Sequence, residues 1–210
     1  MKSRENVYYL FWIFIIGCVV GWCIEGVFSL IKWKEFINHS AVVIGPFNAA
    51  YGLGALVLTA LLFKFKDDKI WKIFLIGFIG GSILEYIMSL GMELVLGFTA
   101  WDYSRKPFNI NGRICVRYSL FWGALGIVWI KYIYPWLIEF IDKIDYDVGK
   151  KLAIWLSVFL LFDGILTGVA INRARQKEKG VEAKYKYEEI LDKTFNKEYL
   201  KNMYNDSWSD

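Results

Sequence analysis

Two glutamates attract attention because they lie inside long apolar segments, where an ionisable side chain is costly. Glu25 and Glu85 each follow two glycines, placed four and eight residues earlier in the chain. Residues four apart share one face of an α-helix, and small residues on that face let a second helix approach closely. A carboxylate within a membrane costs at least about 2.5–3.5 kcal/mol on insertion scales. We therefore expect each glutamate to face another helix and to have a partner or a function.

Three further charged residues are expected to join these carboxylates. Arg113 and Arg117 begin an apolar segment that enters from the same side, and Asp163 lies deeper in the last apolar segment. A guanidinium carries several N–H donors and can bind one or both carboxylates. One interpretation is an ion-pair network that only pins the helices. We favour a substrate or ion site, because glycine-rich helices and proline-interrupted helix starts accompany the carboxylates, as in transporter sites.

The segment 101–113 supplies a second group of polar candidates. It contains Asp102, Tyr103 and Asn109 beside aromatic residues, and Asn48 ends an earlier Pro-Phe-Asn sequence that matches the one ending at Asn109. Turn-forming polar residues beside aromatic anchors are typical of two kinds of loop. One contacts a substrate and caps a polar cluster, and the other is only held at the interface by its rings. Both interpretations stay open.

The common motifs for nucleotides, metals and hydrolytic chemistry are missing from the sequence. It has no G-x-x-x-x-G-K-[ST] loop, no H-E-x-x-H pair and no G-x-S-x-G turn, and its one histidine is His39. The three cysteines lie in or beside apolar segments, which favours neither a disulfide framework nor a zinc site. We therefore assign no catalytic residue, no cofactor and no metal.

The composition indicates that these residues belong to a membrane protein. The 210 residues are 56% hydrophobic and 19% aromatic, with only 22% charged, which is more apolar surface than a domain of this size can bury. An ordinary soluble enzyme, a disordered chain and a fibrous rod are excluded. The net charge of +4 is spread along the chain without a basic face, so no nucleic-acid partner is expected.

The predicted fold is an all-α, polytopic bundle of transmembrane helices. Residues 1–171 form the transmembrane domain, and residues 172–210 form a polar tail with an amphipathic helical pattern. Apolar runs long enough to cross a bilayer predict five spans, at 8–31, 41–63, 70–96, 114–141 and 152–171. The tail is interpreted either as a solvated extension or as a docking helix for a partner.

The chain also resembles itself at an offset of about 60 residues. Shared residues at an offset of 60 are Gly17/Gly77, Gly21/Gly81, Glu25/Glu85, Ser29/Ser89 and Leu30/Leu90. Later matches are Pro46-Phe47-Asn48 with Pro107-Phe108-Asn109, and Gly54-Ala55-Leu56 with Gly123-Ala124-Leu125. We interpret these as two copies of a helix hairpin, about 8–63 and about 70–141, followed by a fifth span at 152–171. Copies two spans apart cross in the same sense, which predicts a parallel repeat.

These motifs together resemble a bacterial family, called ABC-transporter type IV or CmpB-like. The resemblance runs from about residue 8 to about residue 135. It is carried by Gly21-Trp22 with Glu25, Gly45-Pro46, Tyr51-Gly52-Leu53-Gly54, Leu84-Glu85-Tyr86, Trp101-Asp102-Tyr103-Ser104, Pro107-Phe108-Asn109, Asn111-Gly112-Arg113 and Ser119-Leu120-Phe121-Trp122-Gly123. The resemblance implies a multi-pass, permease-like protein of the bacterial cell membrane.

The leading hypothesis is a permease component whose polar site contains the embedded carboxylates and arginines. Because the chain lacks a nucleotide-binding loop, an ABC system would need a separate ATP-binding subunit. Two alternatives stay open: a membrane enzyme or lipid-handling protein acting at the headgroup interface, and a structural partner in a membrane complex. A small bundle is also compatible with a homo-oligomer. Basic residues divide equally between the two sides, and the run from Arg173 to Lys179 favours a cytoplasmic C-terminus.

Overall fold

The computed structural model describes residues 3–97, 99 and 101–203, and it is built almost entirely from helices. The predicted all-α class is confirmed. The elements are α1 (Ser3–Trp33), α2 (Ala49–Leu62), η1 (Phe63–Phe65), α3 (Ile70–Leu96), β1 (Asn109–Ile110), β2 (Ile114–Cys115), α4 (Val116–Val128), η2 (Trp129–Ile133), α5 (Tyr134–Asp142), α6 (Tyr146–Glu178), α7 (Lys186–Thr194) and α8 (Lys197–Met203).

Four of the described helical stretches are long and apolar enough to cross a membrane: 7–33, 70–95, 116–142 and 146–178. The second predicted span differs from the other four. Its residues 41–48 are not helical, and α2 begins only at Ala49. At about 1.5 Å per residue α2 is about 21 Å long, shorter than the hydrocarbon layer of about 30 Å.

The late start of α2 has a local cause in the sequence. Gly45 has a φ of +89°, a conformation that side chains with a Cβ rarely adopt, and Pro46 follows it. The Ser40 hydroxyl then bonds across the turn, donating to the Gly45 carbonyl at 2.8 Å. Asn48 finally caps the helix by accepting from the Ala50 amide at 3.2 Å. The expected helix interruption at Gly45-Pro46 is confirmed.

A second irregularity divides the long rod formed by α4, η2 and α5. The π-helical turn η2 precedes Pro135, which stands in the first turn of α5. Proline has no N–H and crowds the preceding helical turn, so wider backbone bonding at this place accommodates it. The rod continues to Asp142 and spans the fourth predicted segment, although its helix begins at Val116 rather than at Ile114.

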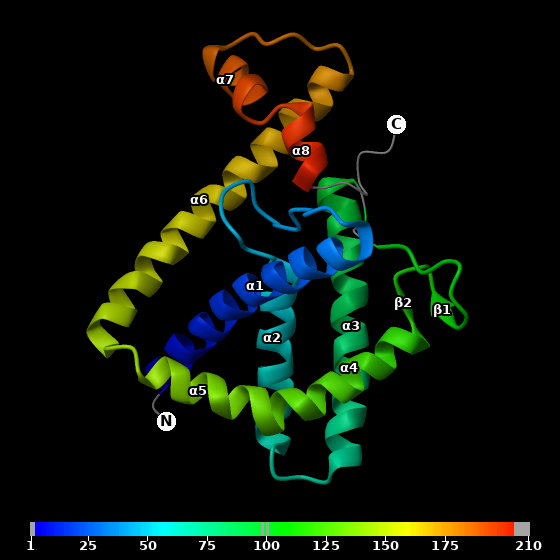
Figure 1. Ribbon diagram of the computed structural model, residues 1–210, viewed down its shortest axis with the longest axis vertical. Coiled ribbons are helices and arrows are strands. Elements are labelled where there is room, and N and C mark those ends of the chain that lie inside the picture. The colour runs from blue at the N-terminus through cyan, green and yellow to red at the C-terminus, as the bar shows by residue number, and fades with distance from the viewer. Residues whose placement is uncertain (1–2, 98, 100, 204–210) are drawn as a thin grey trace.

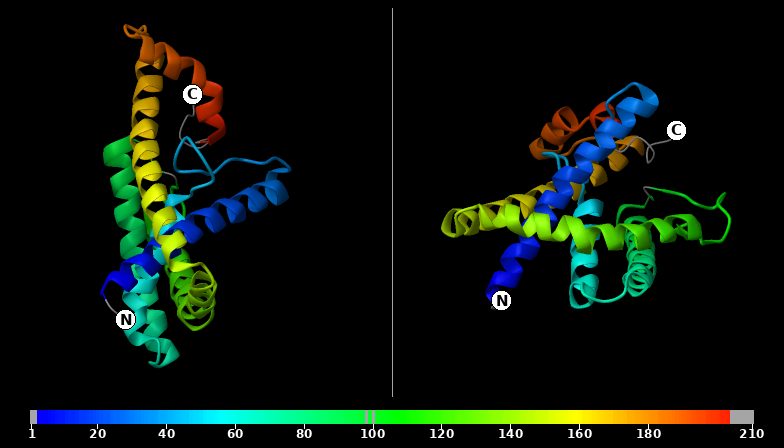
Figure 2. Two further views of the ribbon diagram at one scale, coloured as in Figure 1. Left: turned by 90° about the vertical axis from the view of Figure 1, so that its left-hand side faces the viewer. Right: turned by 60° about the horizontal axis from the view of Figure 1, so that its bottom comes forward.

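Packing is organised as two helix hairpins that share a core. The closest contacts join α1 with α2 and α3 with α4, and α2 also packs on α3. Figure 1 shows α2 and α3 as an upright pair, with α1 and the α4–α5 rod crossing it obliquely. The right-hand view of Figure 2 shows α1 crossing the α4–α5 rod, and α1 contacts α5. The shared core includes Ile13, Leu58, Leu62, Ile73 and Ile141, all nearly inaccessible.

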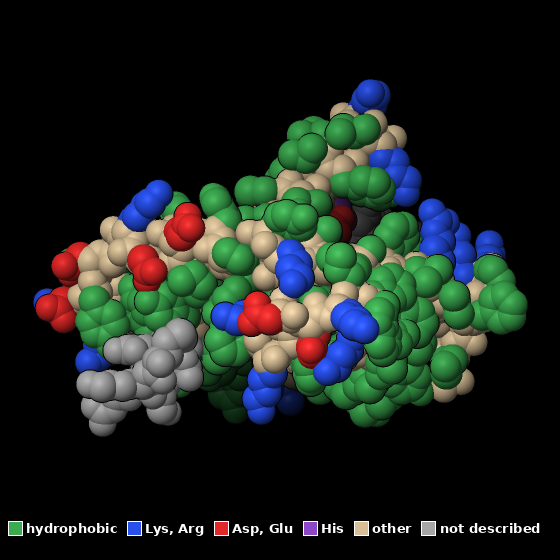
Figure 3. All heavy atoms as spheres, turned by 90° about the horizontal axis from the view of Figure 1, so that it is seen from below, with side chains coloured by type: hydrophobic (Ala, Val, Ile, Leu, Met, Phe, Trp, Pro, Cys, Tyr) green, Lys and Arg blue, Asp and Glu red, His purple; other side chains and the backbone are tan. Residues whose placement is uncertain are grey.

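Large apolar side chains cover much of the outside of the molecule. Seen from below, hydrophobic side chains form broad continuous areas, and acidic and basic side chains gather in smaller groups (Figure 3). On α6 alone, Trp155, Leu161, Phe162 and Ile165 are each at least 60% exposed. An apolar exterior around an apolar core is what helices surrounded by lipid require, so the chain is a multi-pass membrane protein.

The polar tail folds back on the end of α6 as two short helices, α7 and α8. Leu191 and Leu200 are buried there with Val43 of the first loop, residues 34–48, and with Ala170 of α6. Arg173 donates two hydrogen bonds to the Asp192 carboxylate, each 3.0 Å long. The predicted amphipathic pattern is therefore partly used inside the chain, while residues 204–210 lie outside the described part.

Candidate functional site

The stripe of α1 that contains Gly21 and Glu25 forms a seat for an aromatic ring. A Cβ added at Gly21 would lie 2.2 Å from Cγ of Tyr51, so only glycine leaves room for this ring. The Tyr51 hydroxyl then donates to Oε1 of Glu25 at 2.6 Å. The glycine positions the ring, and the ring positions a donor against the carboxylate one turn later.

The same arrangement recurs between α3 and α4 with a different aromatic residue. A Cβ at Gly81 would lie 2.3 Å from Cγ of Trp122, and the indole Nε1 donates to Oε2 of Glu85 at 3.2 Å. Two glycine seats therefore hold two aromatic rings whose polar edges bind the two glutamates. This correspondence supports the repeat interpretation from contacts that the sequence matches did not use.

The contacts also correct the register of the second helix in each proposed copy. A Cβ added at Gly17 would lie 3.1 Å from the Cα of Gly52, and one added at Gly77 would lie 3.4 Å from the Cα of Gly123. Gly52 therefore corresponds to Gly123 by packing, whereas matching of letters pairs Gly54 with Gly123. The sequence match is a poor guide here, because a three-residue Gly-Ala-Leu match is common in apolar helices. Corresponding positions are better identified by the close approach of helix backbones.

The two glutamates differ in their surroundings. Glu25 is partly exposed, whereas Glu85 is 7% exposed. Glu85 also accepts a second bond, from the Tyr103 hydroxyl at 2.9 Å, and the Tyr103 ring stacks on Tyr118 with centroids 4.5 Å apart. Burial, and then the neighbouring carboxylate of Glu85, raise the pKa of Tyr103 above its ordinary value, so Tyr103 stays a proton donor. A buried carboxylate is thus linked directly to residues 101–113, which we call the third loop.

Arg113 joins a different carboxylate from the ones that the sequence suggested. It forms an ion pair with Glu93 and donates to the Ser89 hydroxyl at 3.2 Å. Its guanidinium also lies over the Tyr86 ring, 5.8 Å from the centroid. Arg117 is exposed and has no ion pair among the described residues. Instead of one cluster, the structure has separate partners for Glu25, Glu85 and Arg113.

Asp163 is also separate from these groups, and it holds the first loop. It is 0% exposed, and its Oδ1 accepts from the Ile44 amide at 3.1 Å. One turn later, Thr167 accepts from the Val43 amide at 2.9 Å. The other Asp163 oxygen is buried and has no hydrogen-bond partner among the residues that the structure describes. Two side chains of α6 therefore satisfy irregular backbone beside the short helix α2, as non-helical backbone at membrane depth requires.

The remaining predicted site residues organise the loops. Asn48 caps α2, and Asn109 donates to the carbonyls of Ser104 and Lys106. Asp102 accepts from the amide and the hydroxyl of Ser104 at 2.8 and 2.9 Å. These bonds lower the pKa of Asp102, so its carboxylate is charged at neutral pH. Of these three, Asp102 alone lines the pocket described next.

A polar pocket of about 260 Å³ lies at the end of α3, where the third loop returns toward the membrane. Its lining residues are Ser89, Glu93, Thr99, Trp101, Asp102, Asn111, Gly112 and Arg113. Trp101 fixes the loop by donating from Nε1 to the Arg113 carbonyl at 3.0 Å. Glu93 and Trp122 were missed as site residues in the sequence. Glu93 follows Ser89 by one helical turn and could have been found by extending the stripe.

Comparison with known proteins now places the chain. No curated protein and no solved structure matches it. A family model matches residues 12–168, about three quarters of the chain, and this range contains both glycine seats, both glutamates and the whole third loop. The chain therefore belongs to the family described as Putative ABC-transporter type IV.

Proposed function

We propose that the chain is the membrane-spanning, permease-like component of an ABC-type transport system, with its polar site at the third-loop end of α3 and α4. The proposed site joins the buried Glu85 and its donors to the pocket lined by Arg113 and Asp102. The family name supports the ABC association, and the multi-pass helices support the membrane role. A separate subunit would have to bind ATP.

The observation that carries this proposal is the position of Glu85. It is a buried carboxylate inside a helix long enough to span the membrane, and it is bonded to both the next helix and the third loop. Intramembrane carboxylates are expensive and commonly serve substrate or ion pathways. Movement of the loop would change the bond from Tyr103, which gives the loop and the embedded carboxylate a direct connection.

The first experiment isolates the tagged full-length chain from its native membranes in mild detergent and identifies the proteins that accompany it. We expect an ATP-binding subunit at a fixed ratio, retained over repeated preparations. ATPase activity of the complex, reconstituted in lipid vesicles, supplies the functional measurement. Reproducible isolation of the chain without any ATP-binding protein would overturn the ABC assignment.

The second experiment tests the site within that complex. Glu85→Gln is expected to reduce ATPase activity by about tenfold or more, because an electrostatic contact with a buried charge is lost. Glu139→Gln is the matched control, since Glu139 is an exposed glutamate on α5 and undergoes the same chemical change. Equal activity of the two variants, both assembled with the partner, would contradict the role of Glu85.

A further inference from the structure

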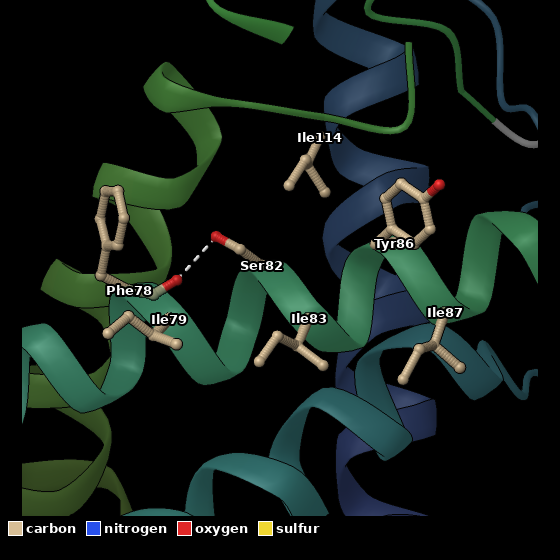
Figure 4. A pocket seen from close by; sticks show the side chains of 7 residues that line it. All are labelled: Phe78, Ile79, Ser82, Ile83, Tyr86, Ile87 and Ile114. Atoms are coloured by element: carbon tan, nitrogen blue, oxygen red, sulfur yellow. Dashed lines mark hydrogen bonds between the residues drawn. The ribbon is translucent and has the colours of Figure 1, made fainter. Parts of the chain in front are cut away.

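An apolar groove runs along the exposed face of α3. Ile79, Ile83 and Ile87 stand one turn apart along the helix, and Ile114 of β2 closes the other side, beside Tyr86 (Figure 4). The three isoleucines on α3 are 55–60% exposed, and the groove has a volume of about 320 Å³. The Ser82 hydroxyl donates to the Phe78 carbonyl at 2.6 Å and lies 2.6 Å from the Ser119 hydroxyl, so its polar atom is satisfied within the protein.

This groove and the polar pocket are consecutive along the same two elements. The groove uses Ser82 and Tyr86 of α3, and the pocket uses Ser89 and Glu93, which continue the same helical face at intervals of three and four residues. On the opposite side, residues 111–113 line the pocket and Ile114 lines the groove. Between Ile79 and Glu93 the helix rises about 21 Å, which matches a headgroup followed by much of an acyl chain.

Tyr86 marks the boundary between the apolar and polar parts. Its ring lines the groove, its hydroxyl accepts from the Asn111 amide nitrogen at 2.9 Å, and the Arg113 guanidinium lies over its ring. Trp101 lines the polar pocket beside it. Tyrosine and tryptophan favour the headgroup level of a membrane, where one edge of the ring is apolar and the other is wet. The polar pocket therefore lies where lipid headgroups lie.

The charges of the pocket indicate what kind of headgroup fits. Arg113 provides a cation that suits a phosphate, and Glu93 and Asp102 provide two carboxylates that suit an ammonium group. The lining therefore carries one more negative charge than positive charge. This excess disfavours an anionic headgroup and favours one that carries an ammonium group beside its phosphate.

From this arrangement we infer that the groove and the pocket form a binding site for a zwitterionic aminophospholipid. The phosphate lies toward Arg113, the ammonium lies toward Glu93 and Asp102, and one acyl chain follows Ile87, Ile83 and Ile79. The inference rests on the proposed polar site but not on transport. It names the class of molecule held at the outer end of that site.

Binding is tested by delipidating the full-length protein in detergent and measuring retained lipid by native mass spectrometry. The probes are phosphatidylethanolamine and phosphatidylglycerol with identical acyl chains. We expect phosphatidylethanolamine to be retained about tenfold better, a difference typical of charge-assisted hydrogen bonds. Equal retention of the two lipids would mean that the retained molecules are ordinary surrounding lipid. A preference for phosphatidylglycerol would mean that the site binds an anionic lipid. Either result would overturn the inference.

Two variants and two controls assign the binding to this place. Arg113→Gln removes the headgroup cation, and Ile83→Trp fills the groove while leaving the charges intact. The matched controls are Arg117→Gln, an exposed arginine on α4, and Ile165→Trp, an exposed isoleucine on α6. The selectivity should disappear in the first pair and persist in the second. Unchanged selectivity in a folded Ile83→Trp protein would sink the assignment even if Arg113→Gln failed to fold.

The outcome is distinguishable from that of the proposed function. Lipid selectivity without an ATP-binding subunit would overturn only the ABC assignment, because binding is measured on the isolated chain. An ATP-binding subunit in fixed ratio, together with equal retention of both lipids, would overturn only the lipid site.

Discussion

The α1–α2 and α3–α4 hairpins use one packing device and reach different results. In both, a glycine seats an aromatic ring whose polar edge binds a glutamate one turn later. Glu25 is left partly exposed with one donor, whereas Glu85 is buried with two. Close helix packing therefore sets the position of each carboxylate, and the connecting loop decides whether a second donor reaches it.

The two loops differ in what holds them. The first loop is held from outside by Asp163 and Thr167 of α6, and by Tyr199 of α8, which donates to the Val43 carbonyl at 2.7 Å. The third loop is held by the short β1–β2 pair and by Trp101, and it is bonded to Glu85, Tyr86 and Glu93 of α3. The polar pocket lies between this loop and the end of α3.

The largest expected effect is loss of the close approach between α3 and α4. Gly77→Val places methyl groups against backbone, since a Cβ at this position already lies 2.9 Å from the Trp122 carbonyl oxygen. We expect a loss of about 2–3 kcal/mol in the free energy of unfolding, measured by thermal denaturation in mild detergent. Gly91→Val on the same helix is the control, because a Cβ there meets nothing within 4 Å. Similar losses in both variants would contradict the role of the close approach between α3 and α4.

The second effect should be confined to the first loop. Thr167→Val keeps the side-chain shape but removes the acceptor of the buried Val43 amide, which costs about 1–3 kcal/mol. Hydrogen exchange should accelerate over residues 40–47 and stay unchanged over residues 101–113. Faster exchange in both loops would show that the two hairpins are more strongly coupled than the contacts indicate. Ser157→Ala, on α6 with a bond only to its own helix, is the control.

A smaller difference is expected between the two glutamates themselves. Glu85→Gln leaves one acceptor oxygen for two donors, so the Tyr103 hydroxyl or the Trp122 indole loses its partner at a buried position, at about 1–2 kcal/mol. Glu25→Gln retains an acceptor for Tyr51 at a partly exposed position, and we expect less than about 0.5 kcal/mol. Thermal unfolding in detergent compares them. A larger loss at Glu25 would reverse the comparison.

The smallest expected effect concerns pH and the tail. Hydrogen bonds from Arg173 lower the pKa of Asp192, so this contact stabilises the docked tail above the ordinary aspartate pKa of about 3.9. The stabilisation is lost as the pH falls through the lowered value. Limited proteolysis by an acid-active protease should therefore cut the tail faster below about pH 4. Asp192→Asn should remove this pH dependence. If the cleavage rate of that variant still rose below about pH 4, the pH dependence would arise from another group.

Much of the membrane architecture could be predicted from the sequence, because hydropathy and helix length act locally. The third predicted span, 70–96, coincides with α3, and four of the five predicted spans correspond to helices long enough to cross. The interruption by Gly45 and Pro46 was predictable for the same reason. How far the irregular segment extends was not, because it depends on the Ser40 hydroxyl and on amides held by α6.

The candidate site could be predicted only in part. Four predicted residues lie where the third loop packs on α3: Glu85, Asp102, Tyr103 and Arg113. Two of them are bonded directly, because the Tyr103 hydroxyl donates to Glu85. The single charged cluster expected with Glu25, Arg117 and Asp163 is absent from the described contacts. Topology predicts which side of the membrane a residue is near, but not which of several carboxylates a guanidinium reaches.

The sequence by itself determined an all-helical membrane protein, the glycine–glutamate stripes and the place where α2 would be interrupted, since composition and spacing act over a few turns of helix. Tertiary structure alone decided that Arg113 binds Glu93, that Asp163 holds the first loop and that a groove continues into a polar pocket. These outcomes depend on distances between side chains far apart in the chain, and such distances follow from how whole helices cross and pack.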